Sequence, residues 1–351
     1  TILTLVTFAD AWYVGQLGTA ALASLALVFP FQTLMQMMSG GAIGGGVTSS
    51  VARALGSDDE SKAASVLWHA IIIAGAMSMV FVVTLGFFSR PVFALLGGTG
   101  EALNGAVAYA RIAFGAGLAI WMLYILSAAL RGMGDTVTPA RAITVGSVVQ
   151  VGLSGALTLG WGVFPKVGVV GPAIAIIVCQ GGAAFYLAFH LASGKARVPL
   201  RSHRLEWSIF KDILQVGGIG LLNSFFMATT VIVVTGFIGR YGTDALAGYG
   251  LGARLELMLV PLSFGIGAAL TAAVGANYGA KQYARARRVA WAGSAITLLV
   301  SGVIGCAVSV APGLWLDMFT SEPGPYGYGA TYLTIAGPFY ALFGAGQALY
   351  F

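Results

Sequence analysis

Two acidic residues, Asp10 and Glu256, stand inside long apolar segments of the sequence. A carboxylate in such surroundings can hold a proton, an alkali metal ion or an organic cation. These ligands compete for one negative charge, so the binding of one excludes the others. Burial raises the pKa of a carboxyl group and a neighbouring cation lowers it, which lets the surroundings set that competition. The chemistry that these two residues suggest is the exchange of one cation for another.

Other polar residues in the apolar segments are candidates to support such a site: Gln32, Gln36, Gln150, Ser154 and Asn223. Two interpretations remain open beside cation binding. Asp10 could be held by hydroxyl or amide groups only to fix helix packing, and Glu256 could neutralise an arginine from another segment. Arg254 is a poor partner within the same helix, because residues two apart do not face each other.

The sequence contains no motif for catalysis or for a bound metal. It lacks HExxH, GxSxG and a phosphate-binding loop with a terminal Lys. Its two cysteines, Cys179 and Cys306, form no CxxC pair. We therefore expect neither an enzyme nor a resident cofactor, with H⁺ or Na⁺ as the only ion involved.

Composition places these residues in a membrane. The chain has 351 residues, of which 58% are hydrophobic and 9% charged, and its mean hydropathy is +0.88. Soluble domains carry about 25% charged residues. Residues 66–88 and 142–164 contain no Asp, Glu, Lys or Arg, and about 20 apolar residues suffice to cross a bilayer. The sequence predicts an all-α polytopic membrane protein.

Ten apolar segments are long enough to be candidate spans. They are Thr1–Leu17, Ala20–Ala52, Ala64–Phe88, Ala106–Leu130, Ala142–Phe164, Val167–Ala192, Ile213–Gly239, Ala245–Ala276, Val289–Trp315 and Tyr326–Phe351. A polar linker, residues 193–208, separates six spans from four. The chain has no initiator Met and stops within an apolar run, so we expect a fragment, cut inside its first and last spans.

Loop charges predict the orientation, because Lys and Arg are enriched in cytoplasmic loops. Loops on one side hold only Arg90, Lys166 and Arg240. The opposite side holds thirteen: Arg53, Lys62, Arg131, Arg141, Lys195, Arg197, Arg201, Arg204, Lys211, Lys281, Arg285, Arg287 and Arg288. We expect linker 193–208 in the cytoplasm and the protein in the cell's inner (plasma) membrane. The net charge of +6 follows from this topology and does not indicate nucleic-acid binding.

One phrase occurs twice in the sequence. Residues 14–24 read VGQLGTAALAS and residues 238–248 read IGRYGTDALAG, with six identical positions. Six spans separate the copies, so both enter the membrane with the same orientation, as in transporters built from parallel repeats. The sequence thus predicts an N-lobe at residues 1–192 and a C-lobe at residues 209–351. Neither candidate acid belongs to the repeat: Val234 stands where Asp10 would recur, and Glu256 falls opposite Gln32 or Thr33.

The chain resembles the multidrug and toxic compound extrusion (MATE) family. FADAWYVGQLGTAALAS around Asp10, LRGMGDTVTPA at residues 130–140 and VGANYGAKQYARA at residues 274–286 carry the resemblance. It implies twelve helices in two six-helix lobes around a central cavity, so the second lobe would be truncated and about ten helices present. Asp10 matches the family's helix-one aspartate. Gln150 and Ser154 stand where one branch of the family has Asn-x-x-x-Asp in helix five.

The resemblance implies export of small organic cations in exchange for H⁺ or Na⁺, by a monomer that alternates access between its lobes. We expect Asp10 to be the exchanged charge and Glu256 a second cation site. The alternative is a flippase for lipid-linked oligosaccharides of related architecture. A flippase should need cationic side chains for pyrophosphate, and only Arg254 and Arg111 are candidates.

Overall fold

The computed structural model describes the backbone of residues 2–350 and their side chains, except those of residues 2–4, 224, 228, 232, 243 and 257. The described residues form helices joined by loops and form no strand, which confirms the all-α prediction. It divides into two compact units, Thr1–Gly220 and Leu221–Phe351. The predicted lobes at residues 1–192 and 209–351 stay a prediction, and each unit is described by itself.

Nine α-helices lie wholly within the described residues of the first unit, 2–220. They are α1 (Ile2–Gly15), α2 (Thr19–Gln36), α3 (Gly44–Gly56), α4 (Glu60–Phe81), α5 (Ser89–Leu95), α6 (Gly100–Gly115), α7 (Gly117–Gly132), α8 (Val137–Leu159) and α9 (Gly171–Ala192). Two π-helical turns continue them, η1 (Met37–Ile43) after α2 and η2 (Val82–Phe87) after α4, and a short 3₁₀ turn, η3 (Gly168–Val170), precedes α9. Helix α10 (Trp207–Ile238) begins in this unit and ends in the second.

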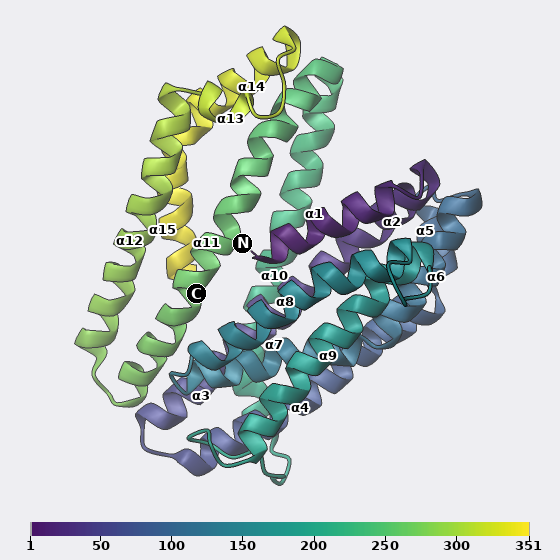
Figure 1. The fold of residues 1–351 in the computed structure, drawn as a ribbon. Coiled ribbons are helices and arrows are strands. Elements are labelled where there is room, and N and C mark those ends of the chain that lie inside the picture. Colours follow the sequence, from purple (N-terminus) through teal and green to yellow (C-terminus); the bar gives the residue numbers. More distant parts are fainter. Residues whose placement is uncertain (1, 351) are drawn as a thin grey trace. The chain divides into compact units, whose positions relative to one another are not determined.

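The part of the second unit that the structure describes, residues 221–350, contains the end of α10 and five further α-helices. They are α11 (Thr243–Gly279), α12 (Tyr283–Val310), α13 (Gly313–Leu316), α14 (Pro323–Ala336) and α15 (Tyr340–Tyr350), with 3₁₀ turns η4 (Gly239–Tyr241) and η5 (Gly337–Phe339). Helix α12 runs beside α15 and α11, and α14 packs on α11 (Figure 1). The core of this unit consists of Leu255, Leu259, Val308, Leu316, Leu333 and Tyr340.

Seven of the described helical stretches are long and apolar enough to span a membrane, or eight if α6 and α7 form one bent span. The sequence predicts ten. The two that fall outside this number are at the ends: α1 has 14 residues, about 21 Å at 1.5 Å per residue, and the last predicted span is broken at η5. Pro338 lies in that turn and has no N–H for a helical hydrogen bond.

The fourth predicted span, Ala106–Leu130, is bent in the structure. Helices α6 and α7 meet at an angle of 46°. Ala116 separates them, flanked by Gly115 and Gly117, and glycine pairs are a common cause of sharp kinks. The predicted boundary also changes, because α6 begins at Gly100, within the preceding loop of the prediction.

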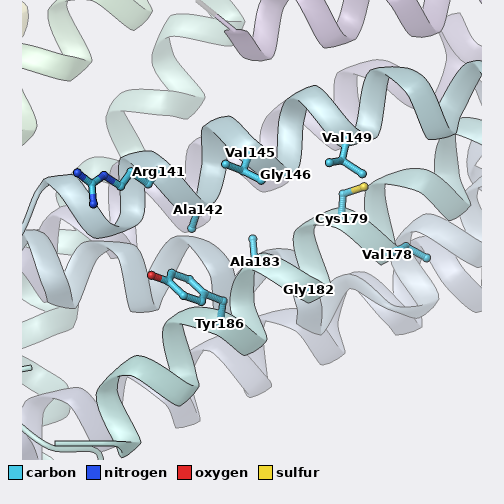
Figure 2. Close-up of a pocket in the computed structure, with 10 residues that line it drawn as sticks. All are labelled: Arg141, Ala142, Val145, Gly146, Val149, Val178, Cys179, Gly182, Ala183 and Tyr186. Atoms are coloured by element: carbon cyan, nitrogen blue, oxygen red, sulfur yellow. The ribbon is translucent and has the colours of Figure 1, made fainter. Parts of the chain in front are cut away.

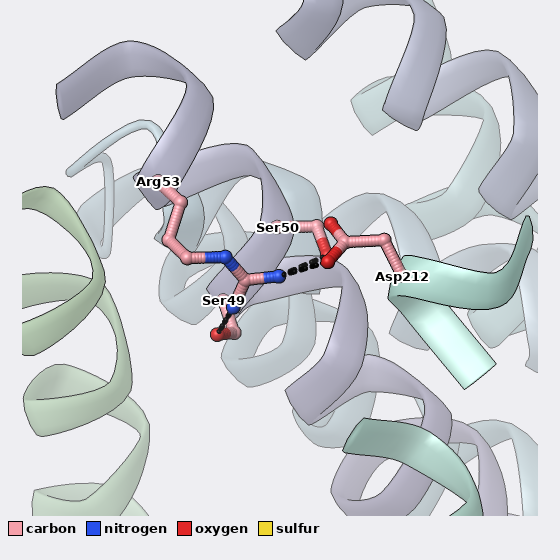
Figure 3. Close-up of polar contacts among 4 residues, drawn as sticks. All are labelled: Ser49, Ser50, Arg53 and Asp212. Atoms are coloured by element: carbon pink, nitrogen blue, oxygen red, sulfur yellow. Dashed lines mark hydrogen bonds and ion pairs between the residues drawn. The ribbon is translucent and has the colours of Figure 1, made fainter. Parts of the chain in front are cut away.

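The start of α10 is fastened to the rest of the first unit by an ion pair. Arg53 at the end of α3 lies 2.8 Å from the carboxylate of Asp212 on α10 (Figure 3). The same guanidinium hydrogen-bonds the hydroxyls of Ser49 and Ser50, the latter at 3.0 Å. These bonds hold the helix that follows the linker against α3.

Candidate cation-binding site

The carboxylate of Asp10 is buried in the first unit and accepts a hydrogen bond from Ser154. Asp10 on α1 is 5% exposed and Ser154 on α8 is 0% exposed. Their oxygens are 2.5 Å apart. Helix α1 packs along α8, which brings together two residues that are 144 positions apart. No Lys, Arg or His among the described residues forms an ion pair with Asp10.

Small residues on α8 allow α1 to come this close. Gly155 follows Ser154, and a Cβ atom there would lie 2.7 Å from the ring of Tyr13 and 2.7 Å from that of Trp161. These two rings meet edge to face, with centroids 5.5 Å apart. A larger residue at position 155 would therefore push α1 away and lengthen the bond between Asp10 and Ser154.

Two further polar residues extend the site across two more helices. Tyr109 on α6 interacts electrostatically with Asp10. Its hydroxyl donates to the side-chain oxygen of Gln32 on α2, at 3.4 Å. Asp10, Ser154, Tyr109 and Gln32 thus come from four helices and form one buried polar cluster, which we call the Asp10 cluster. An anionic carboxylate surrounded by neutral oxygens offers ligands that suit a proton or a hard cation.

The structure separates the remaining predicted residues of this unit from Asp10. Gln150 lies one turn before Ser154 and is buried with Gln180 and Tyr124 around a small cavity between α7, α8 and α9. Gln36 is half-buried at the end of α2, where its backbone carbonyl accepts from Ser39 at 3.3 Å. Only Ser154 touches Asp10 directly, and only Gln32 reaches it through Tyr109.

Glu256 occupies a separate cluster in the second unit. The hydroxyl of Tyr332 on α14 donates to the Glu256 carboxylate on α11. The rings of Tyr249 and Tyr332 pack edge to face, with their centroids 5.4 Å apart. Tyr249 and Tyr340 both interact electrostatically with Glu256. We call this group the Glu256 cluster.

No arginine among the described residues pairs with Glu256. The guanidinium of Arg254 instead lies over the ring of Phe319, 5.9 Å from its centroid. The sequence interpretation in which Glu256 neutralises an arginine therefore finds no partner in this part of the chain. The carboxylate is satisfied by a phenol, a partner that leaves its charge uncompensated.

Asn223 also belongs to the second unit. Its amide lies 3.9 Å from the sulfur of Met227 on α10 and hydrogen-bonds Tyr350. It makes no described contact with Glu256. The prediction that Asn223 supports cation binding stays a prediction.

Sequence reasoning missed the tyrosines of both clusters. Tyr109 and Tyr332 each lie within an apolar segment, where a phenol must find a hydrogen-bond partner. That pairing requirement was the available signal: a buried tyrosine and a buried acid in one membrane domain are natural partners. Among the described residues, no group of three His, Cys, Asp or Glu could hold a metal ion.

Comparison with known proteins relates the chain to membrane transporters. A family model described as MatE matches residues 1–154 and 220–350. The chain is 25% identical over 340 residues to "Probable multidrug resistance protein YoeA" of Bacillus subtilis, covering 95% of this chain and 73% of that protein. It is 26% identical to "FAD transporter" of Shewanella oneidensis, covering 82% of this chain and 64% of the relative.

A solved structure, "Crystal structure of MATE in complex with MaD3S", superposes with a TM-score of 0.89 at 23% identity. The superposition covers 99% of this chain and 77% of that one. At this identity the likeness establishes the fold. The chain spans about two thirds of the length of these curated relatives, 73% of one and 64% of the other.

Proposed function

The chain belongs to the MatE family, and from that premise we propose that it is a secondary antiporter that exports small organic cations in exchange for H⁺ or Na⁺. Relatives named as multidrug resistance and multidrug export proteins support transport of drugs. We infer a monomer in the inner membrane, with linker 193–208 in the cytoplasm, that alternates access by moving its two predicted lobes. The gradient would supply the work, about 2.3 kcal/mol per charge and 100 mV.

The observation that carries the proposal is the buried Asp10 carboxylate without a cationic partner. An isolated charge inside a protein is costly unless it is neutralised or hydrogen-bonded. One bond from Ser154 leaves most of the carboxylate's acceptor capacity unused. A coupling ion and a cationic substrate would both relieve this cost, and only one can do so at a time. Mutually exclusive occupancy of one charge is what coupled exchange requires.

Glu256 is the proposed second cation site. Its phenolic partner donates a hydrogen bond without cancelling the negative charge. Tyrosine faces also attract cations through their ring quadrupoles. The Glu256 cluster thus combines a carboxylate with aromatic rings, which are the two kinds of group that organic cations favour.

Ethidium efflux from vesicles tests the role of Asp10. The assay uses the protein together with any segments that flank this chain. We expect Asp10→Asn, which keeps the shape and removes the charge, to abolish gradient-driven efflux. Glu101→Gln, an exposed acid at the start of α6, is the matched control and should retain it. Wild-type rates in Asp10→Asn would overturn the assigned role.

The coupling ion is tested by imposing one gradient at a time. A Na⁺ gradient at equal pH and a pH gradient without Na⁺ should drive ethidium efflux unequally, and the effective one identifies the ion. The flippase alternative predicts that neither gradient moves ethidium. Neither candidate arginine supports that alternative, because Arg111 is exposed on α6 and Arg254 lies over Phe319 in the other unit.

A further inference from the structure

An apolar groove runs along the first unit between α8 and α9, away from the Asp10 cluster. Its volume is about 400 Å³. The wall on α8 includes Val145 and Val149, and the wall on α9 includes Val178 (Figure 2). These three valines are 63%, 54% and 56% exposed. Glycine and alanine on the facing sides of both helices leave the space open.

Both helices that form the groove are long and apolar enough to span a membrane. The groove extends from Arg141 to Val149, eight residues of α8 or about 12 Å along the helix. Half of a bilayer's hydrocarbon core is about 15 Å deep. The groove therefore matches the depth of one leaflet.

A basic side chain marks one end of the groove. Arg141 lies near the start of α8, at the end of the unit from which the linker leaves α9. It is exposed, and none of the acids that the structure describes pairs with it. Tyr186 lines the same end from α9, with its hydroxyl directed toward the Arg141 end (Figure 2). Tyrosine and arginine together are typical of the level of lipid headgroups.

The neighbouring carboxylate does not cancel the charge of Arg141. Asp135, in the loop before α8, accepts from the backbone N–H groups of Val137 and Thr138 and lies 3.9 Å from His190. Its oxygens are thus directed to the start of α8 and to the end of α9. An anion at the groove's mouth would meet an unpaired guanidinium.

We propose that the groove between α8 and α9 binds one acyl chain of an anionic phospholipid, with its phosphate held by Arg141. The valine walls take the chain and the guanidinium takes the phosphate, for which its fork of donors is suited. The lipid comes from the leaflet on the linker side. This site is independent of the transported substrate and of the coupling ion.

Variants that fill the groove or remove its charge test the proposal. Gly182 lines the groove, and a Cβ atom there would meet nothing within 4 Å, so Gly182→Leu places a bulky side chain in the groove from an unobstructed Cβ position. Gly152→Leu is the control, since Gly152 is also exposed and free of neighbours within 4 Å but lies outside the groove. Arg141→Gln removes the charge at the end of the groove. Its control is Arg287→Gln, because Arg287 is also an exposed arginine and lies near the start of α12.

Native mass spectrometry in dodecyl maltoside measures retention of phosphatidylglycerol against phosphatidylcholine. We expect Arg141→Gln to lower the preference for phosphatidylglycerol about five-fold, as follows from about 1 kcal/mol per basic residue at a membrane surface. Gly182→Leu should reduce retention of both lipids. Both controls should behave like the wild type. An unchanged preference in Arg141→Gln, or unchanged retention in Gly182→Leu, would overturn the proposal.

Alkylation of Cys179, which lines the groove, gives a second readout that depends on location. In a Cys306→Ala background it is the only thiol of residues 1–351, which contain two cysteines, and any cysteine in flanking segments is replaced as well. Phosphatidylglycerol should slow its reaction with N-ethylmaleimide at a lower mole fraction than phosphatidylcholine does. If neither lipid changed the alkylation rate of Cys179, the proposed site would be contradicted. This readout does not depend on whether Gly182→Leu folds.

Discussion

The hydroxyl of Ser154 donates to the carboxylate of Asp10 across 144 residues of sequence, at 2.5 Å. This bond joins the first helix of the unit to α8 and fixes the carboxylate among neutral groups. Its geometry is compatible with a structural role and with an exchanged charge. The structural role and the exchange role predict different effects on efflux when Ser154 or Asp10 is replaced.

Ser154→Ala should destabilise the protein and weaken ion coupling without abolishing it. The variant leaves a buried charged acceptor with one bond fewer, which costs about 1–3 kcal/mol in free energy of unfolding. The Asp10 charge persists, so ethidium efflux should continue with an altered dependence on ion concentration. Thermal unfolding in detergent and efflux at graded ion concentrations measure the two effects.

Ser147→Ala is the matched control, because Ser147 is a buried serine of the same helix that does not contact Asp10. If both serine variants changed the ion dependence equally, the bond to Asp10 would have no special part in coupling. If Ser154→Ala abolished efflux as completely as Asp10→Asn, the hydroxyl itself would be an indispensable ligand.

Tyr332→Phe should reduce the stability of the second unit. The Glu256 carboxylate would lose the phenol that donates to it, and a hydrogen bond to a charged group contributes about 1.5–3 kcal/mol. Because Glu256 is only half-buried, water would replace part of that bond and the loss should fall near the lower end. Tyr328→Phe, an exposed tyrosine on the same helix, should be neutral in the same thermal unfolding assay.

Most of the spanning helices were predictable from the sequence, because long apolar runs identify segments that can cross a membrane. Their breaks were less accessible. The π-helical turn Met37–Ile43 lies inside an apolar run, and its Ser39, Gly40 and Gly41 were the only local signal of a break. The break at Gly337–Phe339 could have been predicted from Pro338. It was missed because the residues around Pro338 form one continuous apolar run.

The site was predictable only in part. The rarity of acids in apolar segments pointed to Asp10 and Glu256, and the resemblance pointed to Ser154. The partners Tyr109 and Tyr332 depend on which helices pack together, and a single sequence does not show packing. Gln150 and Ser154 lie one turn apart on α8, yet only Ser154 faces α1. The four-residue spacing of Gln150 and Ser154 places them on about the same face of α8. The packing of α1 on α8 determines which of them contacts Asp10.

His69 should hold linker 193–208 against α4 within the first unit. Its Nε2 accepts from the backbone N–H of Glu206 at 2.8 Å, and its Nδ1 lies 2.7 Å from the carbonyl oxygen of Ser65. The carbonyl of Ser65 can only accept, so Nδ1 is the nitrogen that donates to it. The ring of Phe210 packs on the imidazole of His69, with the two ring centroids 4.7 Å apart. His69→Ala should therefore increase amide hydrogen exchange at Glu206 and at the start of α10.

His203→Ala is the control for that experiment, because His203 lies in the linker and bonds only the nearby carbonyl of Arg201, at 3.0 Å, among the described residues. It should leave exchange at Glu206 unchanged. Equal protection of Glu206 in His69→Ala and in the wild type would mean that other contacts, such as the Arg53–Asp212 and Arg197–Glu60 ion pairs, hold this segment without His69.

The loop carboxylate of Asp135 should make stability depend on pH in the acid range. Burial raises its pKa, but the hydrogen bonds from Thr138 and Val137 and the charge of His190 outweigh burial, so the net pKa lies below the usual 3.8. A depressed folded-state pKa contributes stability that is present above pH 3.8 and is lost as the pH falls through the folded value. The difference in unfolding temperature between wild type and Asp135→Ala should therefore be largest above pH 3.8 and shrink as the pH falls through the folded-state pKa.

Asp135→Asn separates the charge from the hydrogen bonds in this prediction. Asparagine caps a helix about as well as aspartate, whereas alanine loses about 1 kcal/mol. Asp135→Asn should thus retain most of the stability at pH 6, and its residual difference from the wild type should vanish in acid. If the asparagine variant were as unstable as the alanine variant at pH 6, the charge, rather than the bonds to the first turn of α8, would be what stabilises this end of the unit.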